Sequence, residues 1–429
     1  MLIEFSVENY LSFKEKKTIS MEAANIRQLK NTNVFIDKDN DYKLLKTAAI
    51  YGANASGKSN LFKAMEFALD FIVMSAKDMQ IGDEINVKPF LLSSVSAKKP
   101  SSFEFIFIAD KKIYRYKFIA DKKEVIKEEL YIKKSKKQEE RLFARSQKQI
   151  EFSSSFMSGS ILEKISEEIK NNKFENTIRP NSLFLSVIAQ FNGNIAKSIL
   201  DWAKNFRIIY GGTNKNYDST VDKLKDEKKL FLEILDIADC SIKDLLIKPS
   251  NLSNRRPFRS FHTHSLHNSI KTIKTIHSVF DEKDKTIEFD LNEQESLGTQ
   301  RLIAMLGPII ETLSYGSILV IDELESNLHP LIIRFLVELF YSEKWNKKNA
   351  QLIFNTHNHY LLNSQILRRD QIWFTEKDKE ERTDLYCLID LKTPDGKAIR
   401  YDRVFYKDYL IGKYGAIPFI GRIKSSNTL

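Results

Sequence analysis

The chain has 429 residues, of which 42% are hydrophobic and 29% are charged. This length allows roughly two to four domains, and the composition is that of globular proteins, which excludes disordered and collagen-like chains. No apolar run reaches the roughly 18 residues that a membrane-spanning helix needs, and the N-terminus lacks the basic start of a signal peptide. The two cysteines, Cys240 and Cys387, are too few for a metal framework and suit a reducing compartment, so we expect a cytoplasmic protein with no membrane partner.

The net charge of +10 arises from 67 Lys/Arg against 57 Asp/Glu and is concentrated in two segments. Residues 110–150 hold 14 basic and 7 acidic side chains, and residues 245–280 hold six basic side chains and no acidic one. Such segments can attract nucleic acid through its phosphates. A solvated, lysine-rich surface gives the same counts, so contact with nucleic acid is one of two interpretations of these segments.

Apolar periodicity divides the chain into β-rich and helical stretches. Near the N-terminus it predicts a strand, a turn and a strand over residues 1–20, a short buried strand over 47–51 and a helix over 61–79. Alternating patterns then predict a β-rich region over 85–152. The pattern is helical over 161–169, 184–191, 195–206 and 222–246, with loops over 211–220 and 249–269, and an α/β pattern resumes near residue 286.

The first chemical motif lies between the predicted strand and the predicted helix, at residues 52–59. Its sequence, Gly-Ala-Asn-Ala-Ser-Gly-Lys-Ser, matches G-x-x-x-x-G-K-[ST] at every position. In this pattern the glycines let backbone N–H groups wrap phosphates, and the helix that follows adds its positive end. We therefore predict an ATP site in which Lys58 reaches the β- and γ-phosphates and Ser59 binds Mg²⁺. The predicted nucleotide-binding residues of this loop are Gly52, Asn54, Ala55, Ser56, Gly57, Lys58, Ser59 and Asn60.

Two further strand ends carry polar side chains. Residues 318–321 are Ile-Leu-Val-Ile, and Asp322 and Glu323 follow them, which is the pattern of the second half of a phosphate-loop NTPase site. We expect Asp322 to hold Mg²⁺ through water and Glu323 to polarise the attacking water. Another apolar strand, residues 351–354, precedes Asn355, Thr356 and His357, and the position of His357 suits a hydrogen bond to the γ-phosphate.

A second anion site is predicted where residues 295–300, Glu-Ser-Leu-Gly-Thr-Gln, precede a helix over 301–313. Ser296 and Gly298 would lie at the N-terminus of that helix, where backbone N–H groups bind anions. Because the chain already has one phosphate loop, a second γ-phosphate site indicates that nucleotide is shared between two chains.

The ordered set of phosphate loop, Ser-x-Gly signature, Asp-Glu strand end and histidine resembles the ABC-type ATPase heads of the SMC and RecF kind. More closely, it resembles the AAA-family ATP-binding proteins of bacterial abortive-infection and anti-phage loci. The middle of the chain, about 150–285, matches weakly. The stretches that carry the resemblance are Val7–Phe13, Tyr51–Asn60, Glu295–Leu302, Val320–Pro330, Phe354–Asn358 and Tyr409–Pro418.

The resemblance implies an α/β fold, namely an ABC-type P-loop ATPase head with a mixed β-sheet lobe and an inserted helical subdomain. Residues 1–155 would form the N-terminal part of the head, 156–285 a mostly helical insertion with a basic loop, and 286–429 the C-terminal part. The implied cofactors are ATP and Mg²⁺.

The resemblance also implies roles for single residues. Ser296 and Gly298 would bind the γ-phosphate held by Lys58 of a second copy, Glu323 would be the catalytic glutamate, and His357 would be the switch. The signature departs from the transporter pattern Ser-Gly-Gly-Gln and lies nearer the SMC side. Gln190 is a candidate for the glutamine that contacts magnesium in such heads, with an ordinary helix residue as the alternative.

The implied function is a nucleotide-driven homodimeric switch that regulates a separate effector, such as an RloB-like or TOPRIM nuclease encoded by a neighbouring gene. The alternatives are a RecF-like DNA clamp, which the two basic segments favour, and a scaffold with little turnover, which Glu323 argues against. Only 72 residues follow His357, and they contain no Asp-x-Asp pair, so we expect ATP hydrolysis without nucleic-acid cleavage. A group of histidines lacks nearby cysteines and carboxylates, which favours a solvated basic loop over a zinc site. The members of that group are His262, His264, His267 and His277.

Overall fold

A six-stranded sheet forms the centre of the protein. The computed structural model describes residues 1–133, 138–147, 149–157, 178–211, 217–249 and 271–418. The order of this sheet is β11-β15-β16-β5-β17-β18, and all neighbouring pairs are parallel except β17 with β18. Because the parallel strands run the same way, their carboxyl ends meet at one edge, where ligands bind in α/β folds. The strands are β11 (Phe206–Ile209), β15 (Ile318–Ile321), β16 (Gln351–Asn355), β5 (Thr47–Gly52), β17 (Ile372–Lys377) and β18 (Thr383–Cys387).

A seven-stranded antiparallel sheet forms the second layer, in the order β10-β9-β8-β7-β6-β1-β2. In β6 the buried residues Phe103, Phe105 and Phe107 alternate with partly exposed ones, which is the pattern of a sheet with one buried face. The predicted β-rich region and the predicted N-terminal strand pair both lie in this sheet. Its strands are β10 (Gln149–Phe152), β9 (Glu139–Ser146), β8 (Val125–Lys133), β7 (Lys112–Ala120), β6 (Ser101–Ala109), β1 (Leu2–Glu8) and β2 (Lys17–Ser20).

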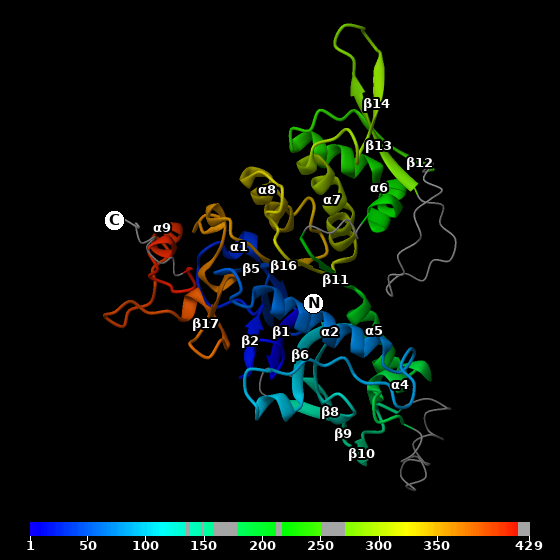
Figure 1. Ribbon diagram of the computed structural model, residues 1–429, viewed down its shortest axis with the longest axis vertical. Helices are drawn as coiled ribbons and strands as arrows, with labels where there is room; N and C mark the ends of the chain where they lie inside the picture. Colours follow the sequence, from blue (N-terminus) through cyan, green and yellow to red (C-terminus); the bar gives the residue numbers. More distant parts are fainter. Residues whose placement is uncertain (134–137, 148, 158–177, 212–216, 250–270, 419–429) are drawn as a thin grey trace, which may run out of the picture.

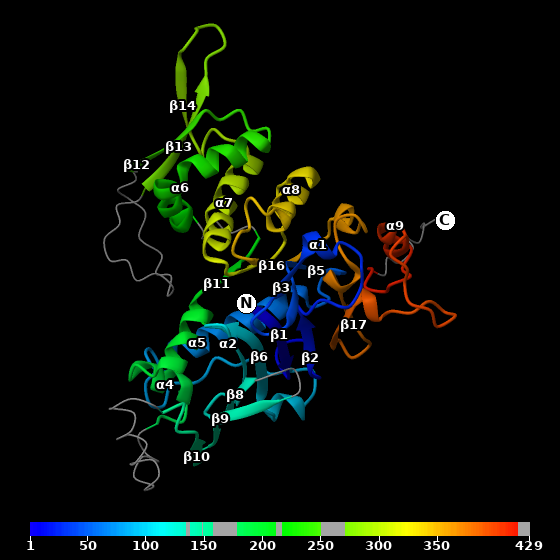
Figure 2. The same cartoon turned by 180° about the vertical axis from the view of Figure 1, so that it is seen from behind.

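The central sheet separates two hydrophobic cores. Ala48 and Ile50 of β5 belong to a core with α2 and the antiparallel sheet, whereas Ala49 and Tyr51 belong to a core with α7 and α8. Figures 1 and 2 show α7 and α8 on the opposite side of the central strands from α2. The helices are α1 (Lys30–Asn33), α2 (Lys58–Met74), α4 (Phe184–Gln190), α5 (Asn194–Lys204), α6 (Tyr217–Ile237), α7 (Leu297–Tyr315), α8 (Pro330–Tyr341) and α9 (Phe405–Leu410).

A three-stranded sheet, β12-β13-β14, projects beyond α6 and α7 at the top of Figure 1. Its strands are β12 (Asp244–Pro249), β13 (Lys271–Ser278) and β14 (Thr286–Asp290), and a two-stranded sheet is made by β3 (Val34–Asp37) and β4 (Tyr42–Leu45). The helix predicted over 222–246 is wrong beyond Ile237, because Asp239 has a φ of +58° and β12 pairs with β13. At its other end this helix begins at Tyr217, inside the predicted loop.

The segment predicted as a mostly helical insertion, 156–285, contributes more than helices. Its strand β11 pairs in parallel with β15, with Phe206 opposite Ile318, and so forms the edge of the central sheet. The physical reason is that Phe206 and Ile209 are buried there, which a short apolar strand achieves by joining an existing sheet. The helix predicted over 161–169 lies outside the described residues, as does most of the loop predicted over 249–269.

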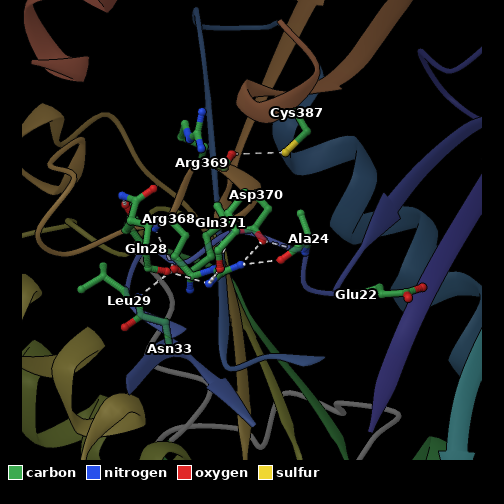
Figure 3. A network of polar contacts seen from close by, with 12 residues as sticks. Glu22, Ala24, Gln28, Leu29, Asn33, Arg368, Arg369, Asp370, Gln371 and Cys387 are labelled. Atoms are coloured by element: carbon green, nitrogen blue, oxygen red, sulfur yellow. Dashed lines mark hydrogen bonds and ion pairs between the residues drawn. The ribbon is translucent and has the colours of Figure 1, made fainter. Parts of the chain in front are cut away.

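A buried polar network fixes the start of β17 next to the N-terminal segment (Figure 3). The guanidinium of Arg368 donates to both carboxylate oxygens of Asp370, at 2.9 and 2.6 Å. It also donates to the carbonyl oxygens of Gln28, at 2.6 Å, and Ala24, at 3.0 Å. Because this buried charge is both paired and hydrogen-bonded, it can be accommodated in the core, and it ties the segment before β17 to residues 24–28.

Candidate functional site

The phosphate loop joins β5 to α2 in a conformation that requires glycine at two positions. Gly57 has a φ of +109°, and a Cβ atom there would collide with the side chain of Thr383. A Cβ atom on Gly52 would lie 2.5 Å from the backbone oxygen of Thr375 and 2.6 Å from Oγ of Ser56. The loop backbone therefore lies directly against β17 and β18, and side chains at these two positions are excluded.

Hydroxyl groups from distant parts of the chain support this loop. Ser56 Oγ and Thr375 Oγ1 share a hydrogen bond of 2.6 Å, and Thr383 Oγ1 donates to the backbone oxygen of Ser56 at 2.9 Å. Ser12 Oγ lies 2.7 Å from Thr383 Oγ1 and accepts a hydrogen bond of 2.8 Å from Asn60 Nδ2. The N-terminal stretch that carries the family resemblance thus reaches the loop. The sequence analysis missed the two threonines, because isolated hydroxyls in strands carry no local signal.

Lys58 is folded back onto its own loop. Its Nζ donates to the carbonyl oxygens of Gly52 at 2.8 Å and Ala53 at 2.9 Å, and the residue is 7% exposed. Burial lowers the pKa of Lys58, and the nearby carboxylates, led by Glu325, oppose that shift. In the part of the chain that the structure describes, no carboxylate forms an ion pair with Lys58, so its charge remains to be matched by a phosphate.

The predicted metal ligands Ser59 and Asp322 lie together. Ser59 Oγ donates to Asp322 Oδ1 at 2.9 Å, and Asn355 Nδ2 donates to the same oxygen. A serine hydroxyl beside a largely buried carboxylate is the kind of oxygen donor set that Mg²⁺ prefers. The residues present therefore fit a magnesium ion bound with the nucleotide.

Glu323 continues β15 in an unusual backbone conformation. Its φ is +54°, in the left-handed region, and its N–H donates to Asn355 Oδ1 at 2.6 Å. The side chain is exposed, and its Oε2 accepts a hydrogen bond of 3.3 Å from Ser326 Oγ. A Cβ atom on Gly211 would lie 2.9 Å from that oxygen, so the glycine leaves the carboxylate its space. Asn355, which the sequence analysis placed at a strand end without a role, holds both acidic residues.

His357 lies in the loop after β16, close to the phosphate loop. The backbone N–H of His357 donates to Glu325 Oε1 at 2.7 Å. Partial burial of the imidazole ring lowers the pKa of His357, and the positive charge of Lys58 lowers this pKa further. The imidazole is therefore biased toward its neutral form, in which one ring nitrogen donates and the other accepts.

The predicted signature forms the first turn of α7. Ser296 is the N-cap, and its Oγ accepts a hydrogen bond of 3.1 Å from the N–H of Thr299. A Cβ atom on Gly298 would lie 3.1 Å from the backbone oxygen of Asn327, in the loop after β15. Ser296 is exposed, as is Leu297 at 67%. The signature is thus presented at the surface, beside the loop that begins with Glu323.

Gln190 lies apart from this group. It is the last residue of α4, whose Ser186 donates to the backbone oxygen of Ile72 at 2.6 Å. Ile72 is about 21 Å along α2 from Lys58, at 1.5 Å per residue, and Figure 1 shows α4 near the far end of α2. The structure does not bring Gln190 beside Ser59 and Asp322.

Tyr210 lies nearer the metal site than the predicted glutamine does. It follows β11 directly, at the carboxyl edge of the central sheet, and its hydroxyl donates to Glu66 Oε2 at 2.7 Å. Burial raises the pKa of Tyr210, with further contributions from Glu66 and Asp322. The sequence analysis missed this residue, because residues 207–210 fall between the helix predicted over 195–206 and the loop predicted over 211–220.

The remaining sequence predictions concern metals and membranes. His277 hydrogen-bonds Glu295 at 2.7 Å, and the other three histidines of the group lie outside the described residues. Across the described ranges, no cluster of histidine, cysteine, aspartate and glutamate has the arrangement of a metal site. Within the same ranges, no helix combines the length and apolarity needed to cross a bilayer.

Comparison with known proteins places this site in a family. The family model described as "AAA domain, putative AbiEii toxin, Type IV TA system" matches residues 48–363, from β5 to beyond His357. Among solved structures, the SMC head domain from Thermotoga maritima is similar, with a TM-score of 0.39 and 13% identity, covering 91% of this chain and 99% of that one. The comparison with curated proteins gave no match. The matched residues make up well over half of the chain and contain the phosphate loop, Asp322, Glu323 and His357, so the protein belongs to this AAA-domain family of the abortive-infection kind.

Proposed function

We propose that the protein hydrolyses ATP and acts as a nucleotide-driven dimeric switch. The observation that supports hydrolysis is the convergence of Lys58, Ser59, Asp322 and Glu323 at the carboxyl edge of one sheet. Binding residues alone would serve a nucleotide sensor, whereas a glutamate next to the metal-binding carboxylate supplies an acceptor for the proton of water.

The chemistry assigned to these residues is an in-line displacement. A magnesium ion held by Ser59 and Asp322 would offset the negative charge of the phosphates. Glu323 accepts a proton from water as the water oxygen bonds to the γ-phosphorus and the bond from that phosphorus to the bridging oxygen breaks. Lys58 stabilises the charge on the β- and γ-phosphates, and neutral His357 hydrogen-bonds a γ-phosphate oxygen. Asn355 fixes the carboxylate of Asp322 and the backbone of Glu323 through its amide hydrogen bonds.

Dimerisation is supported by the exposed position of the signature. Ser296 bonds within its own helix, and Leu297 beside it is exposed. We infer that the N-terminus of α7 binds the γ-phosphate held by Lys58 of a second copy, so that two ATP molecules are enclosed between two chains. Hydrolysis would then open the dimer.

The biological role that we propose is regulation of a separate effector, such as an RloB-like or TOPRIM nuclease encoded by a neighbouring gene. The abortive-infection character of the family supports this role, and the protein would act in the cytoplasm. The described residues after His357 include β17 and β18 of the central sheet and α9.

The experiment that tests the switch uses Glu323→Gln. This variant keeps the binding residues and removes the proton acceptor, so ATP should convert it to a stable dimer, measured by size-exclusion chromatography with light scattering. Lys58→Ala is the matched control and should stay unchanged with ATP. A Glu323→Gln protein that binds ATP and remains a monomer would contradict the shared site.

A RecF-like DNA clamp receives less support. Several basic residues of segment 110–150 are ion-paired within the antiparallel sheet, among them Arg115 with Glu139 and Arg141 with Glu151. ATP turnover measured against protein concentration, with and without double-stranded DNA, distinguishes the two functions. We expect turnover to rise faster than linearly with protein and to be indifferent to DNA, whereas strong stimulation by DNA would favour the clamp.

A further inference from the structure

Arg301 is a buried cation in the second turn of α7, directly behind the signature. Its side chain is 8% exposed, and among the described residues its Nε and Nη2 have no hydrogen-bond partner. Burial removes the water that would solvate the guanidinium, so a cation in this position is costly unless an anion compensates it. The neighbours of α7 in this core are apolar.

The face of α7 on which Arg301 lies is defined by Gly298. Residues three apart share one face of a helix, and a Cβ atom on Gly298 would lie 3.1 Å from the backbone oxygen of Asn327. Arg301 therefore faces the loop of residues 323–328. Burial lowers the pKa of Arg301, and the charge of Glu323 opposes that shift. Glu323 is thus the carboxylate whose charge favours the ionised form of Arg301.

The side chain of Glu323 has few contacts that define its orientation. Its hydrogen bond from Ser326 Oγ is long, at 3.3 Å, and its Cβ and Oε2 atoms lie against Gly211, where an added Cβ atom would come within 2.8 and 2.9 Å of them. The backbone at Glu323 is firmly held, because its N–H donates to Asn355 at 2.6 Å. The position of the residue is therefore set, while the direction of its carboxylate depends on the surrounding charge.

We propose that Arg301 is a positioning residue for Glu323: its buried charge draws the carboxylate into the orientation that accepts a proton from the attacking water. Arg301 touches neither the nucleotide nor the water in this arrangement and acts only through Glu323. The inference rests on the proposed ATP hydrolysis.

The first test compares Arg301→Met and Arg301→Lys. Methionine keeps the apolar stem and removes the charge, so kcat should fall about tenfold or more, as for other residues that orient an active-site group, while the Kd for ATP stays within about twofold. Lysine restores a charge without the planar guanidinium and should recover part of kcat. Arg207→Met is the matched control, because Arg207 pairs with Glu311 of α7 at 2.8 Å, away from Glu323, and it should leave kcat unchanged.

The second test is a double-mutant cycle with Glu323→Gln, measured as single-turnover hydrolysis. If Arg301 acts through Glu323, Arg301→Met causes no further loss when the carboxylate is already absent. Equal losses in both backgrounds, or a Lys variant as inactive as Met, would overturn the proposal. Should the Met variant not fold, as judged by thermal unfolding, Arg301→Lys and Arg301→Gln are compared in the same cycle, with the same criterion.

The two proposals fail in different ways. A wild-type protein that binds ATP without hydrolysing it would refute the proposed function before any variant is made. A wild-type protein that hydrolyses ATP, with an Arg301→Met variant of equal kcat, would refute only the role of Arg301.

Discussion

Ser59 Oγ donates a hydrogen bond of 2.9 Å to Asp322 Oδ1, although the two residues are 263 positions apart in the chain. The contact arises because β5 and β15 flank β16 in a parallel sheet, so that the phosphate loop and the two acids leave the sheet at the same edge. It joins the two halves of the proposed ATPase site directly. We therefore expect residues that hold this contact in place to be as important for ATP turnover as Ser59 and Asp322 themselves.

Asn355 is the first such residue. Its amide donates to Asp322 and accepts from the N–H of Glu323, so Asn355→Ala releases both acids. We expect ATP turnover to fall about 10- to 100-fold, as when partners of metal ligands are removed. Phosphate release measures the effect, with Asn363→Ala from a nearby loop as the control. A folded Asn355→Ala protein with wild-type turnover would show that the bonds to the acids are dispensable.

Mixing two inactive variants tests whether sites are shared. Lys58→Ala should lose ATP binding, and Ser296→Arg should bind ATP without hydrolysing it, since a large side chain fills the α7 N-terminus. In a mixture, random pairing gives half heterodimers, each with one intact site, so turnover should recover to about a quarter of the wild-type value. No recovery, with dimers demonstrated in the mixture, would mean that each chain hydrolyses ATP alone.

The pKa of His357 provides a pH-dependent prediction. Burial and then Lys58 lower it from the ordinary value of 6.5. Lys58→Met should raise the pKa of His357, measured by NMR titration of the ring protons, whereas Lys63→Met on the exposed face of α2 should not. An unchanged value in Lys58→Met would mean that burial alone causes the shift.

The same shift has a defined sign for stability. The folded protein binds fewer protons at His357 than the unfolded chain does, because the pKa of His357 is lowered on folding. The contribution of His357 to the free energy of unfolding is therefore fully present above pH 6.5, and it declines as the pH falls from 6.5 toward the lowered pKa. His357→Gln should reduce this dependence in urea unfolding measured between pH 5 and 7. If the free energy of unfolding of His357→Gln has the same pH dependence as that of the wild type, the dependence arises from other titratable groups.

Two glycines with similar backbone angles allow a matched comparison. Gly57 and Gly82 have φ values of +109° and +91°, but only a Cβ atom on Gly57 meets another side chain, that of Thr383. Gly82→Ala should cost about 1 kcal/mol from backbone strain, and Gly57→Ala should cost about 2 kcal/mol or more and weaken ATP binding. Urea unfolding and nucleotide titration provide the two measurements. Equal losses of unfolding free energy in the two variants would show that the Thr383 side chain moves aside at no cost.

The parts of the site that were predictable are those that lie together in the sequence. The loop at residues 52–59 and the acids after residues 318–321 are contiguous patterns, and the apolar runs before them marked the strands. The end of α6 was not predictable from periodicity, because residues 244–249 become a strand only by pairing with β13. The placement of Gln190 depended likewise on how α4 packs on α2.

The phosphate loop, the acidic strand end and the helix-capping signature were predictable, since each is encoded by neighbouring residues with local geometry. The long-range relationships came from the fold: Asn355 bonds both acids, Thr375, Thr383 and Ser12 support the loop, and Arg301 faces the loop of Glu323. These relationships join residues separated by tens to hundreds of positions. They arise from strand order and helix packing, which depend on the whole core and which no local pattern of side chains encodes.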